Sequence, residues 1–186
     1  MNRGRKLVVD VDRCWGCRAC ETACKQEHGL KGPRAFVEVA RVGPTEIDGV
    51  LHAAYVPQMC VHCENPACAE ACPVGALRVD ESGRVYVEPA ECIGCGACVS
   101  ACPYGAIEID EAAGVAAKCD LCASRMDLGL PPSCLQHCVG RAMALLDDEQ
   151  LKLVARHKSS WGVGTVVYVS SEWPDLGKGF GKTGER

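Results

Sequence analysis

The sequence is poor in aromatic side chains and in long apolar runs. Aromatics make up 5% of its 186 residues, with two Phe and three Trp, so the hydrophobic core must be thin. No run approaches the roughly 18 apolar residues of a membrane span. The basic start, Met1–Lys6, is followed by only three apolar residues before Asp10, too few for a signal-peptide core. These absences predict a soluble, cytoplasmic chain with no direct membrane insertion.

Signatures of nucleic-acid binding and of catalysis are also missing. The formal net charge is -4 and no basic block is present, so the charge gives no case for binding nucleic acid. There is no phosphate loop, no G-x-G-x-x-G nucleotide fingerprint and no recognisable Ser/His/Asp arrangement. We therefore expect that the chain is not an enzyme by itself.

What the chain has in excess is cysteine. It contains 16 cysteines, and 48% of its residues are hydrophobic. A chain of this length forms one domain or two small ones, and such a cysteine content indicates stabilisation by disulfides or by metal. Because cytosolic thiols stay reduced, metal ligation is the preferred interpretation and disulfides are the less favoured one.

The cysteines fall into four sets of four, and none is left over. Every set ends in C-x3-C, and the sets differ in the spacer before it. Two sets have the spacing C-x2-C-x2-C-x3-C, and the others have a middle spacer of four or eleven residues. In chain order the sets are Cys14, Cys17, Cys20 and Cys24; Cys60, Cys63, Cys68 and Cys72; Cys92, Cys95, Cys98 and Cys102; and Cys119, Cys122, Cys134 and Cys138.

The repeat continues past the cysteines. The segment CPVGAL that begins at Cys72 aligns with CPYGAI, which begins at Cys102. Behind Cys138 the same frame is looser, because valine stands in place of the proline. Ala142 and Met143 occupy there the positions that Ala76 and Leu77 have in the second set.

The run C-x2-C-x2-C-x3-C followed by proline is the cysteine pattern of bacterial ferredoxins. In that pattern three cysteines hold one 4Fe-4S cluster and the fourth holds the neighbouring cluster. The loop wraps three thiolates around one face of the cubane, and the following helix carries the fourth cysteine away. Sets must therefore work in pairs. The second and third sets, with 19 residues between Cys72 and Cys92, form one pair, so the first and fourth form the other.

This rule predicts four cluster sites, which we name A to D. It also predicts that one ferredoxin module lies within the sequence of another. The predicted fold is α+β, with a pseudo-twofold relation between an inner module over residues 55–115 and an outer module from residues 1–54 and 116–170. Site A consists of Cys14, Cys17, Cys20 and Cys138; site B of Cys119, Cys122, Cys134 and Cys24; site C of Cys60, Cys63, Cys68 and Cys102; and site D of Cys92, Cys95, Cys98 and Cys72.

Zinc is the competing metal, because it also takes four thiolates from paired C-x2-C units. Zinc ribbons place the two pairs well apart, whereas in this sequence three or four cysteines share one loop and helix turn. The spacing favours iron–sulfur clusters. A zinc-stabilised interaction scaffold is the alternative from another functional class.

Short strands and one helix are predicted around the motifs. Residues 7–12 and 84–87 have the pattern of strands that lead into the first and third loops, and 78–80 and 108–110 that of duplicated strands. Residues 36–40 and 50–56 predict a hairpin over the clusters, with turn signals at Gly43-Pro44 and Asp48-Gly49. Residues 147–157 predict a helix and 164–169 a late strand. The polar, glycine-rich tail 171–186 is expected to be loose or ordered only against a partner.

Residues beside the ligand cysteines are expected to support the clusters. Trp15 is interpreted as an apolar lid on the first loop, with partner contact as the alternative. His62 and His137 are expected near the clusters or at the surface, not as ligands, because thiolates complete every site. Six cations either offset the clusters' negative charge or are ordinary solvated groups: Arg13, Arg18, Lys25, Lys118, Arg125 and Arg141.

Four stretches of the sequence resemble the four-cluster iron–sulfur subunits of molybdenum and tungsten pterin oxidoreductases. They are CWGCRAC from Cys14 with ACK from Ala23, CVHCENPAC from Cys60, CIGC from Cys92 and KCDLC from Lys118. The resemblance covers about residues 5 to 145. The family includes electron-transfer subunits of dimethyl sulfoxide, polysulfide and thiosulfate reductases and of formate dehydrogenases, and similar small subunits accompany tungsten aldehyde oxidoreductases.

This resemblance implies four 4Fe-4S clusters and the transfer of single electrons between a molybdenum or tungsten pterin catalytic subunit and a second redox partner. That partner is a flavin subunit, a ferredoxin or a quinone-reactive subunit. Cys138-Val139 in place of Cys-Pro, and the absence of long insertions, fit a cytoplasmic complex of the aldehyde oxidoreductase type at least as well as a membrane-linked reductase. Export with a signal-bearing catalytic subunit and a free-standing polyferredoxin are the alternatives.

Overall fold

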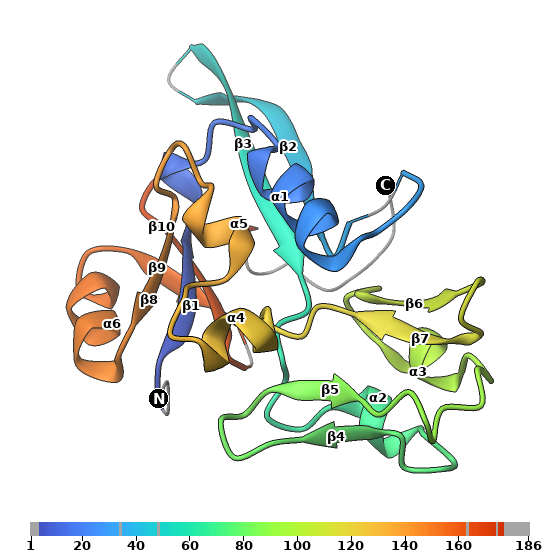
Figure 1. The fold of residues 1–186 in the computed structure, drawn as a ribbon. Coiled ribbons are helices and arrows are strands. Elements are labelled where there is room, and N and C mark those ends of the chain that lie inside the picture. Colours follow the sequence, from blue (N-terminus) through green and yellow to red (C-terminus); the bar gives the residue numbers. More distant parts are fainter. Residues whose placement is uncertain (1–3, 34, 48, 163, 174, 177–186) are drawn as a thin grey trace.

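The computed structural model describes residues 4–33, 35–47, 49–162, 164–173 and 175–176. Figure 1 shows a four-stranded sheet with one helix beside it, a long hairpin, and a region of two small sheets with short helices. The fold is mixed α+β, as predicted. No described helix combines the length and the apolar character that crossing a membrane requires.

The largest sheet joins strands that lie far apart in the sequence. Its order is β8 (Met143–Leu146), β1 (Lys6–Asp10), β10 (Val166–Ser170) and β9 (Ser159–Trp161). Strand β1 runs parallel to β10, with Leu7 opposite Val166, and antiparallel to β8. The predicted strand 7–12 ends at Asp10 because the 3-10 helix η1 (Val11–Arg13) follows it.

Both faces of this sheet carry apolar side chains, because successive residues of β1 and β10 point to opposite faces. Leu7, Val9 and Tyr168 belong to the main core, whereas Val8 and Val167 pack on the opposite face against side chains of α6 (Asp148–Ala155). Helix α6 confirms the helix predicted over 147–157. It begins with a capping box, in which the Asp147 side chain accepts a 2.8 Å hydrogen bond from the Gln150 N–H.

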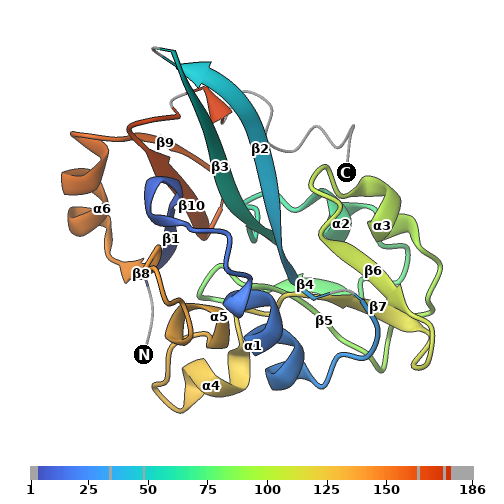
Figure 2. The same cartoon turned by 90° about the horizontal axis from the view of Figure 1, so that it is seen from above.

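The hairpin consists of β2 (Val37–Ile47) and β3 (Val50–Met59) and is longer than predicted. The prediction of a turn at Gly43-Pro44 was wrong. Both residues lie inside β2, where the register with β3 shifts between Val42 and Thr45, because a bulge accommodates a proline without a ladder N–H. Figure 2 shows the hairpin between the four-stranded sheet and the region that holds β4 to β7.

The middle of the chain repeats one short pattern of elements. Helix α2 (Ala67–Glu70) precedes the antiparallel pair β4 (Leu77–Val79) and β5 (Val85–Val87), and α3 (Ala97–Ala101) precedes the pair β6 (Ile107–Asp110) and β7 (Val115–Lys118). The duplicated strands are therefore confirmed. The division into an inner module, 55–115, and an outer module stays a prediction.

The first residues of the predicted tail 171–186 are held in place within the chain itself, which corrects the expectation that all of it is loose or ordered only against a partner. The Ser171 N–H and the Lys158 ammonium each lie 2.8 Å from a carboxylate oxygen of Asp12. Burial raises the pKa of Asp12, but Lys158, Ser170 and Ser171 outweigh it and hold that pKa well below its ordinary value. Residues 174 and 177–186 lie outside the described residues.

Candidate iron–sulfur sites

Helices and loops present the cysteines in one recurrent way. The third cysteine of each set lies in a short helix, which is α1 (Ala19–His28), α2, α3 or α5 (Ser133–Gln136). In three sets the helix ends before the fourth cysteine. Proline at residues 73 and 103 explains two of these ends, because the residue before a proline disfavours the helical conformation. Only Cys24, followed by lysine, lies within its helix.

Each C-x2-C loop has a left-handed residue immediately before its second cysteine. The four residues are Gly16, His62, Gly94 and Leu121, with φ angles of 71°, 50°, 66° and 57°. Glycine adopts this conformation freely, whereas histidine and leucine do so only under constraint. Such turns form concave nests of backbone N–H groups that bind anions, which suits a cluster with four thiolates.

The fourth cysteine in each of the last three sets accepts the same kind of hydrogen bond. The backbone N–H four residues on donates to the sulfur, at 3.3 Å from Ala76 to Cys72, 3.4 Å from Ala106 to Cys102 and 3.2 Å from Ala142 to Cys138. The alignment of Ala142 with Ala76 is thus confirmed. Cys24 differs, because the N–H groups of Phe36 and Val37 reach it from the start of the hairpin.

The same three copies have a left-handed residue three positions after the fourth cysteine. It is Gly75 (φ 67°), Gly105 (φ 58°) and Arg141 (φ 49°). The left-handed conformation costs a residue with a side chain about 1–2 kcal/mol, and glycine avoids that cost at an entropic penalty of roughly 0.5–1 kcal/mol. Arg141→Gly should therefore raise the free energy of unfolding by about 0.5–1 kcal/mol, measured as a higher thermal midpoint of the anaerobically purified protein.

Gly75→Ala is the matched variant with the opposite expectation. No atom lies within 4 Å of a Cβ added at Gly75, so alanine meets only the conformational cost and should lower the midpoint. A midpoint for Arg141→Gly at or below that of the unmodified protein would show that the arginine side chain contributes more than its backbone strain.

Site B is a cavity lined by all four of its predicted ligands, Cys24, Cys119, Cys122 and Cys134. Apolar residues complete the lining, among them Leu7, Phe36 and Met59. The four thiols come from α1, from the loop after β7 and from α5. The Ser133 N–H donates to the Cys122 sulfur at 3.5 Å and the Leu121 N–H to the Cys119 sulfur at 3.4 Å.

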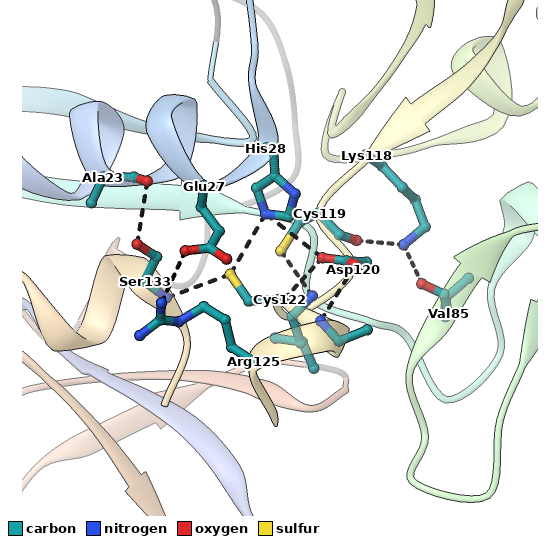
Figure 3. Close-up of polar contacts among 12 residues, drawn as sticks. Ala23, Glu27, His28, Val85, Lys118, Cys119, Asp120, Cys122, Arg125 and Ser133 are labelled. Carbon is teal, nitrogen blue, oxygen red and sulfur yellow. Dashed lines mark hydrogen bonds and ion pairs between the residues drawn. The ribbon is translucent and has the colours of Figure 1, made fainter. Parts of the chain in front are cut away.

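His28 adds a polar contact to site B that the cysteine spacing did not predict. Its Nε2 lies 3.5 Å from the Cys122 sulfur and 3.7 Å from a carboxylate oxygen of Asp120, as Figure 3 shows. Because His28 follows Cys24 by four residues on α1, both side chains lie on one face of the helix. That separation of four residues is the sequence signal that could have identified it.

Site D is also a cavity lined by its four predicted ligands, Cys72, Cys92, Cys95 and Cys98. The Ala116 N–H of β7 donates to the Cys92 sulfur at 3.3 Å. Although desolvation opposes it, backbone N–H groups lower the pKa of Cys72. Cys95 is exposed, so this site reaches the protein surface.

In sites A and C the cysteines lie close enough together to raise one another's pKa. Burial raises the pKa of Cys14, and the neighbouring Cys138 and Cys17 raise it further. In site C, burial raises the pKa of Cys63, and Cys60 and Cys102 act in the same direction. The structure thus brings together the cysteines of every predicted site, and their assignment as ligands stays a prediction.

These sites fit a 4Fe-4S cluster. Every donor in them is a thiol, which is the donor set such clusters take. Burial and neighbouring thiolates raise the pKa of Cys20 to about 12 and that of Cys68 to about 11. Four crowded thiolates therefore need a bound cation to stabilise their charge. The sulfur ligands of a cluster accept hydrogen bonds, and the backbone N–H groups described above provide them.

The tryptophan and the two histidines predicted beside the clusters differ in burial. His62 is not a surface group, since it is 1% exposed and its Nδ1 accepts a 3.0 Å hydrogen bond from the Val85 N–H. Burial lowers its pKa well below the ordinary value, so its ring is neutral. Trp15 is 66% exposed. His137 lies 2.9 Å from the Ser133 carbonyl oxygen.

The predicted cations also divide into two groups. Arg18 and Arg125 form ion pairs with Glu21 and Glu27 on the protein surface or just beneath it. Lys118, in contrast, is buried, which composition and spacing did not predict.

Comparison with known proteins identifies two 4Fe-4S families in this chain. A family described as "4Fe-4S dicluster domain" matches residues 51–148, more than half of the chain, and one described as "4Fe-4S binding domain" matches residues 11–27. The chain is 37% identical over 138 residues to the ferredoxin-like protein YdhX of Escherichia coli K12, covering 74% of this chain and 62% of that protein.

Two relatives carry the names of reductase components. The chain is 42% identical over 153 residues to a component of the anaerobic dimethyl sulfoxide reductase of Escherichia coli K12, covering 78% of this chain and 75% of the relative. It is 38% identical over 146 residues to a component of the tetrathionate reductase of Salmonella typhimurium LT2, covering 76% of this chain and 57% of that relative. The chain therefore spans less than two thirds of the length of some relatives.

These matches agree with the all-thiolate donor sets and with the spacing of the motifs. They coincide with the segments that hold the C-x2-C loops. The chain belongs to the family of 4Fe-4S dicluster, ferredoxin-like proteins, and its cofactors are 4Fe-4S clusters.

Proposed function

We propose that this chain is an electron-transfer subunit that binds four 4Fe-4S clusters at sites A to D. The observation that carries the proposal is the convergence of cysteines from distant motifs, seen best in the cavity lined by Cys24, Cys119, Cys122 and Cys134. A 4Fe-4S cluster supplies one-electron chemistry. The protein holds each cluster, shields it from water and sets its distance from the next.

The proximity of particular cysteines supports an order of electron transfer. Helix α1, which contains Cys20 of site A, contacts α5, which contains Cys134 of site B. Cys60 of site C lies close enough to Cys119 of site B to raise its pKa. Sites C and D share a ferredoxin-like exchange of fourth cysteines, with α2 and α3 in contact. We infer the linear order A, B, C, D.

Sites A and D are the proposed ends of this chain of clusters. Each contains an exposed cysteine, Cys17 or Cys95, and beside it an exposed apolar residue, Trp15 or Ile93, about two thirds exposed. Sites B and C, in contrast, contain no exposed cysteine, since all eight of theirs are buried or half-buried. Electrons therefore enter and leave at the two ends.

The partners follow from the relatives. Two of them are named as parts of a dimethyl sulfoxide reductase and of a tetrathionate reductase, which supports a molybdenum or tungsten pterin catalytic subunit at one end. A second redox partner, a flavin subunit, a ferredoxin or a quinone-reactive subunit, binds at the other. We propose a cytoplasmic location, with export beside a signal-bearing catalytic subunit as the alternative.

Metal content tests the proposal directly. Protein purified without oxygen should contain about 16 iron and 16 sulfide per chain, as four 4Fe-4S clusters require. It should be brown and should lose visible absorption on reduction. Iron and acid-labile sulfide assays, together with visible spectra before and after dithionite, measure both.

Zinc analysis on the same sample is the control. Zinc without sulfide would overturn the electron-transfer proposal in favour of a zinc-stabilised scaffold. Co-purification from native cells then separates a dedicated subunit, which brings a pterin-containing protein with it, from a free-standing polyferredoxin.

A further inference from the structure

A buried lysine lies where the second and fourth cysteine motifs meet. Lys118 is the last residue of β7 and directly precedes Cys119. It is 5% exposed. Its ammonium donates to the Val85 carbonyl oxygen of β5 and, at 2.7 Å, to the Cys119 carbonyl oxygen, as Figure 3 shows.

The second motif reaches the same strand residue from its other side. The Val85 N–H donates to His62 Nδ1, and His62 lies between the site C ligands Cys60 and Cys63. Val85 is thus held by one residue from the site C loop and one from the site B loop.

The Lys118 ammonium lacks a carboxylate partner among the residues that the structure describes. Its hydrogen bonds there go to two neutral carbonyl oxygens, whereas nearby Arg84 forms a 2.8 Å ion pair with Asp80. A buried lysine is rarely tolerated without a compensating negative charge. Asp120 lines the same cavity as Lys118, and the predicted ligand thiols Cys63 and Cys119 lie within reach of the lysine charge.

Those thiols belong to two different sites. Burial raises the pKa of Cys63 and Cys68 in site C and of Cys119 in site B, and the Lys118 charge opposes that rise in all three. Four thiolates around a 2+ cubane leave a formal charge of about -2 on each loaded site. One buried cation therefore lies between two anionic sites.

We propose that Lys118 is a positioning residue whose buried charge makes the clusters of sites B and C easier to reduce than they would otherwise be. A fixed positive charge favours the more negative, reduced form of each cluster. By acting on both sites, it raises both potentials where the electron crosses between the modules. The inference rests on the ligand sets of the proposed function.

Lys118→Gln tests the charge while retaining N–H donors for the two carbonyl oxygens. In a redox titration followed by electron paramagnetic resonance, the reduction equilibrium of the site B and site C clusters should fall at least tenfold. For a one-electron couple that is 59 mV toward lower potential. The clusters of sites A and D should shift less than twofold.

Two further variants make the comparison specific. Lys118→Arg keeps the charge and should leave all four equilibria within twofold of the unmodified protein. Lys25→Met removes the charge beside Cys24, also in site B, but the Lys25 ammonium is in an exposed hydrogen bond with the Gly32 carbonyl oxygen. Solvent screens it, so this variant too should stay within twofold.

Each outcome decides the inference. If Lys118→Gln loses the clusters of sites B and C while Lys118→Arg retains all four, the charge serves to hold the clusters and the inference about their reduction fails. Equal shifts at all four sites, no shift at B and C, or loss of clusters in both Lys118 variants would overturn it. If the unmodified protein carries a full complement of iron, any of those results leaves the proposed function intact. Unmodified protein without iron would refute both the proposed function and this inference.

Discussion

Replacing Cys24 by serine should disrupt the cluster of site B and leave that of site A largely intact. The reason is the predicted exchange of fourth cysteines: Cys24 lies in the first motif but lines the cavity of Cys119, Cys122 and Cys134. A serine oxygen is a harder, poorer ligand for an iron–sulfur cluster than a thiolate. Electron paramagnetic resonance during a redox titration resolves the separate clusters and measures which one changes.

Cys138→Ser is the reciprocal variant. It should disrupt site A, where Cys138 lies near Cys14, and spare site B. The clusters of sites C and D should keep their signals in both variants, because residues 55–115 are predicted to supply all their ligands. Loss of the site A signal in a stably folded Cys24→Ser protein would mean that the outer module does not exchange its fourth cysteines.

Gly164→Ala should cause a large loss of stability for the addition of a single methyl group. A Cβ at Gly164 would overlap the backbone carbonyl oxygens of Val61 and His62. The Val166 N–H donates to the Val61 oxygen at 3.2 Å and the Thr165 N–H to the His62 oxygen at 3.3 Å, so the two segments cannot separate without losing both bonds. Overpacking of this kind costs about 3 kcal/mol, or roughly 6–12 °C in the thermal midpoint of a chain of this size.

Gly129→Ala is the control for this clash. Gly129 has a φ of 77° and open space around a Cβ, so alanine there meets only the left-handed cost of about 1–2 kcal/mol. Circular dichroism of the loaded proteins under anaerobic conditions measures both midpoints. A midpoint for Gly164→Ala equal to or above that of Gly129→Ala would contradict the tight contact between the site C loop and the entry to β10.

The cysteine spacing predicted the local geometry well because that geometry depends on neighbours in sequence. A loop of two residues between cysteines and a helical turn after them leave few conformations, so the frame shared by Ala76, Ala106 and Ala142 was visible in the sequence itself. The duplicated strands and helix α6 follow from local patterns of the same kind.

What spacing could not predict depends on segments that meet only in the folded chain. The sequence indicated strands near Leu7 and Val166 but not that they pair in parallel. Gly43-Pro44 has the composition of a turn, yet the partner strand keeps it within β2. The burial of Lys118 depends on the approach of β5, and that of His62 on β5 and Gly164, so both appeared only as residues next to ligands.

The pairing of β1 with β10 has a consequence for the order of assembly during synthesis. Strand β1 cannot pair with β10 until residue 166 has been synthesised. The predicted sites that include the first motif likewise lack ligands until Cys134 and Cys138 have been synthesised. Residues 55–115, in contrast, emerge from the ribosome with short-range contacts and a predicted full set of thiols for two clusters. Because local contacts form before distant ones, the middle of the chain should take up iron and sulfide first. The first motif would then remain open, with Cys14 to Cys24 exposed to oxygen, until the last strand arrives.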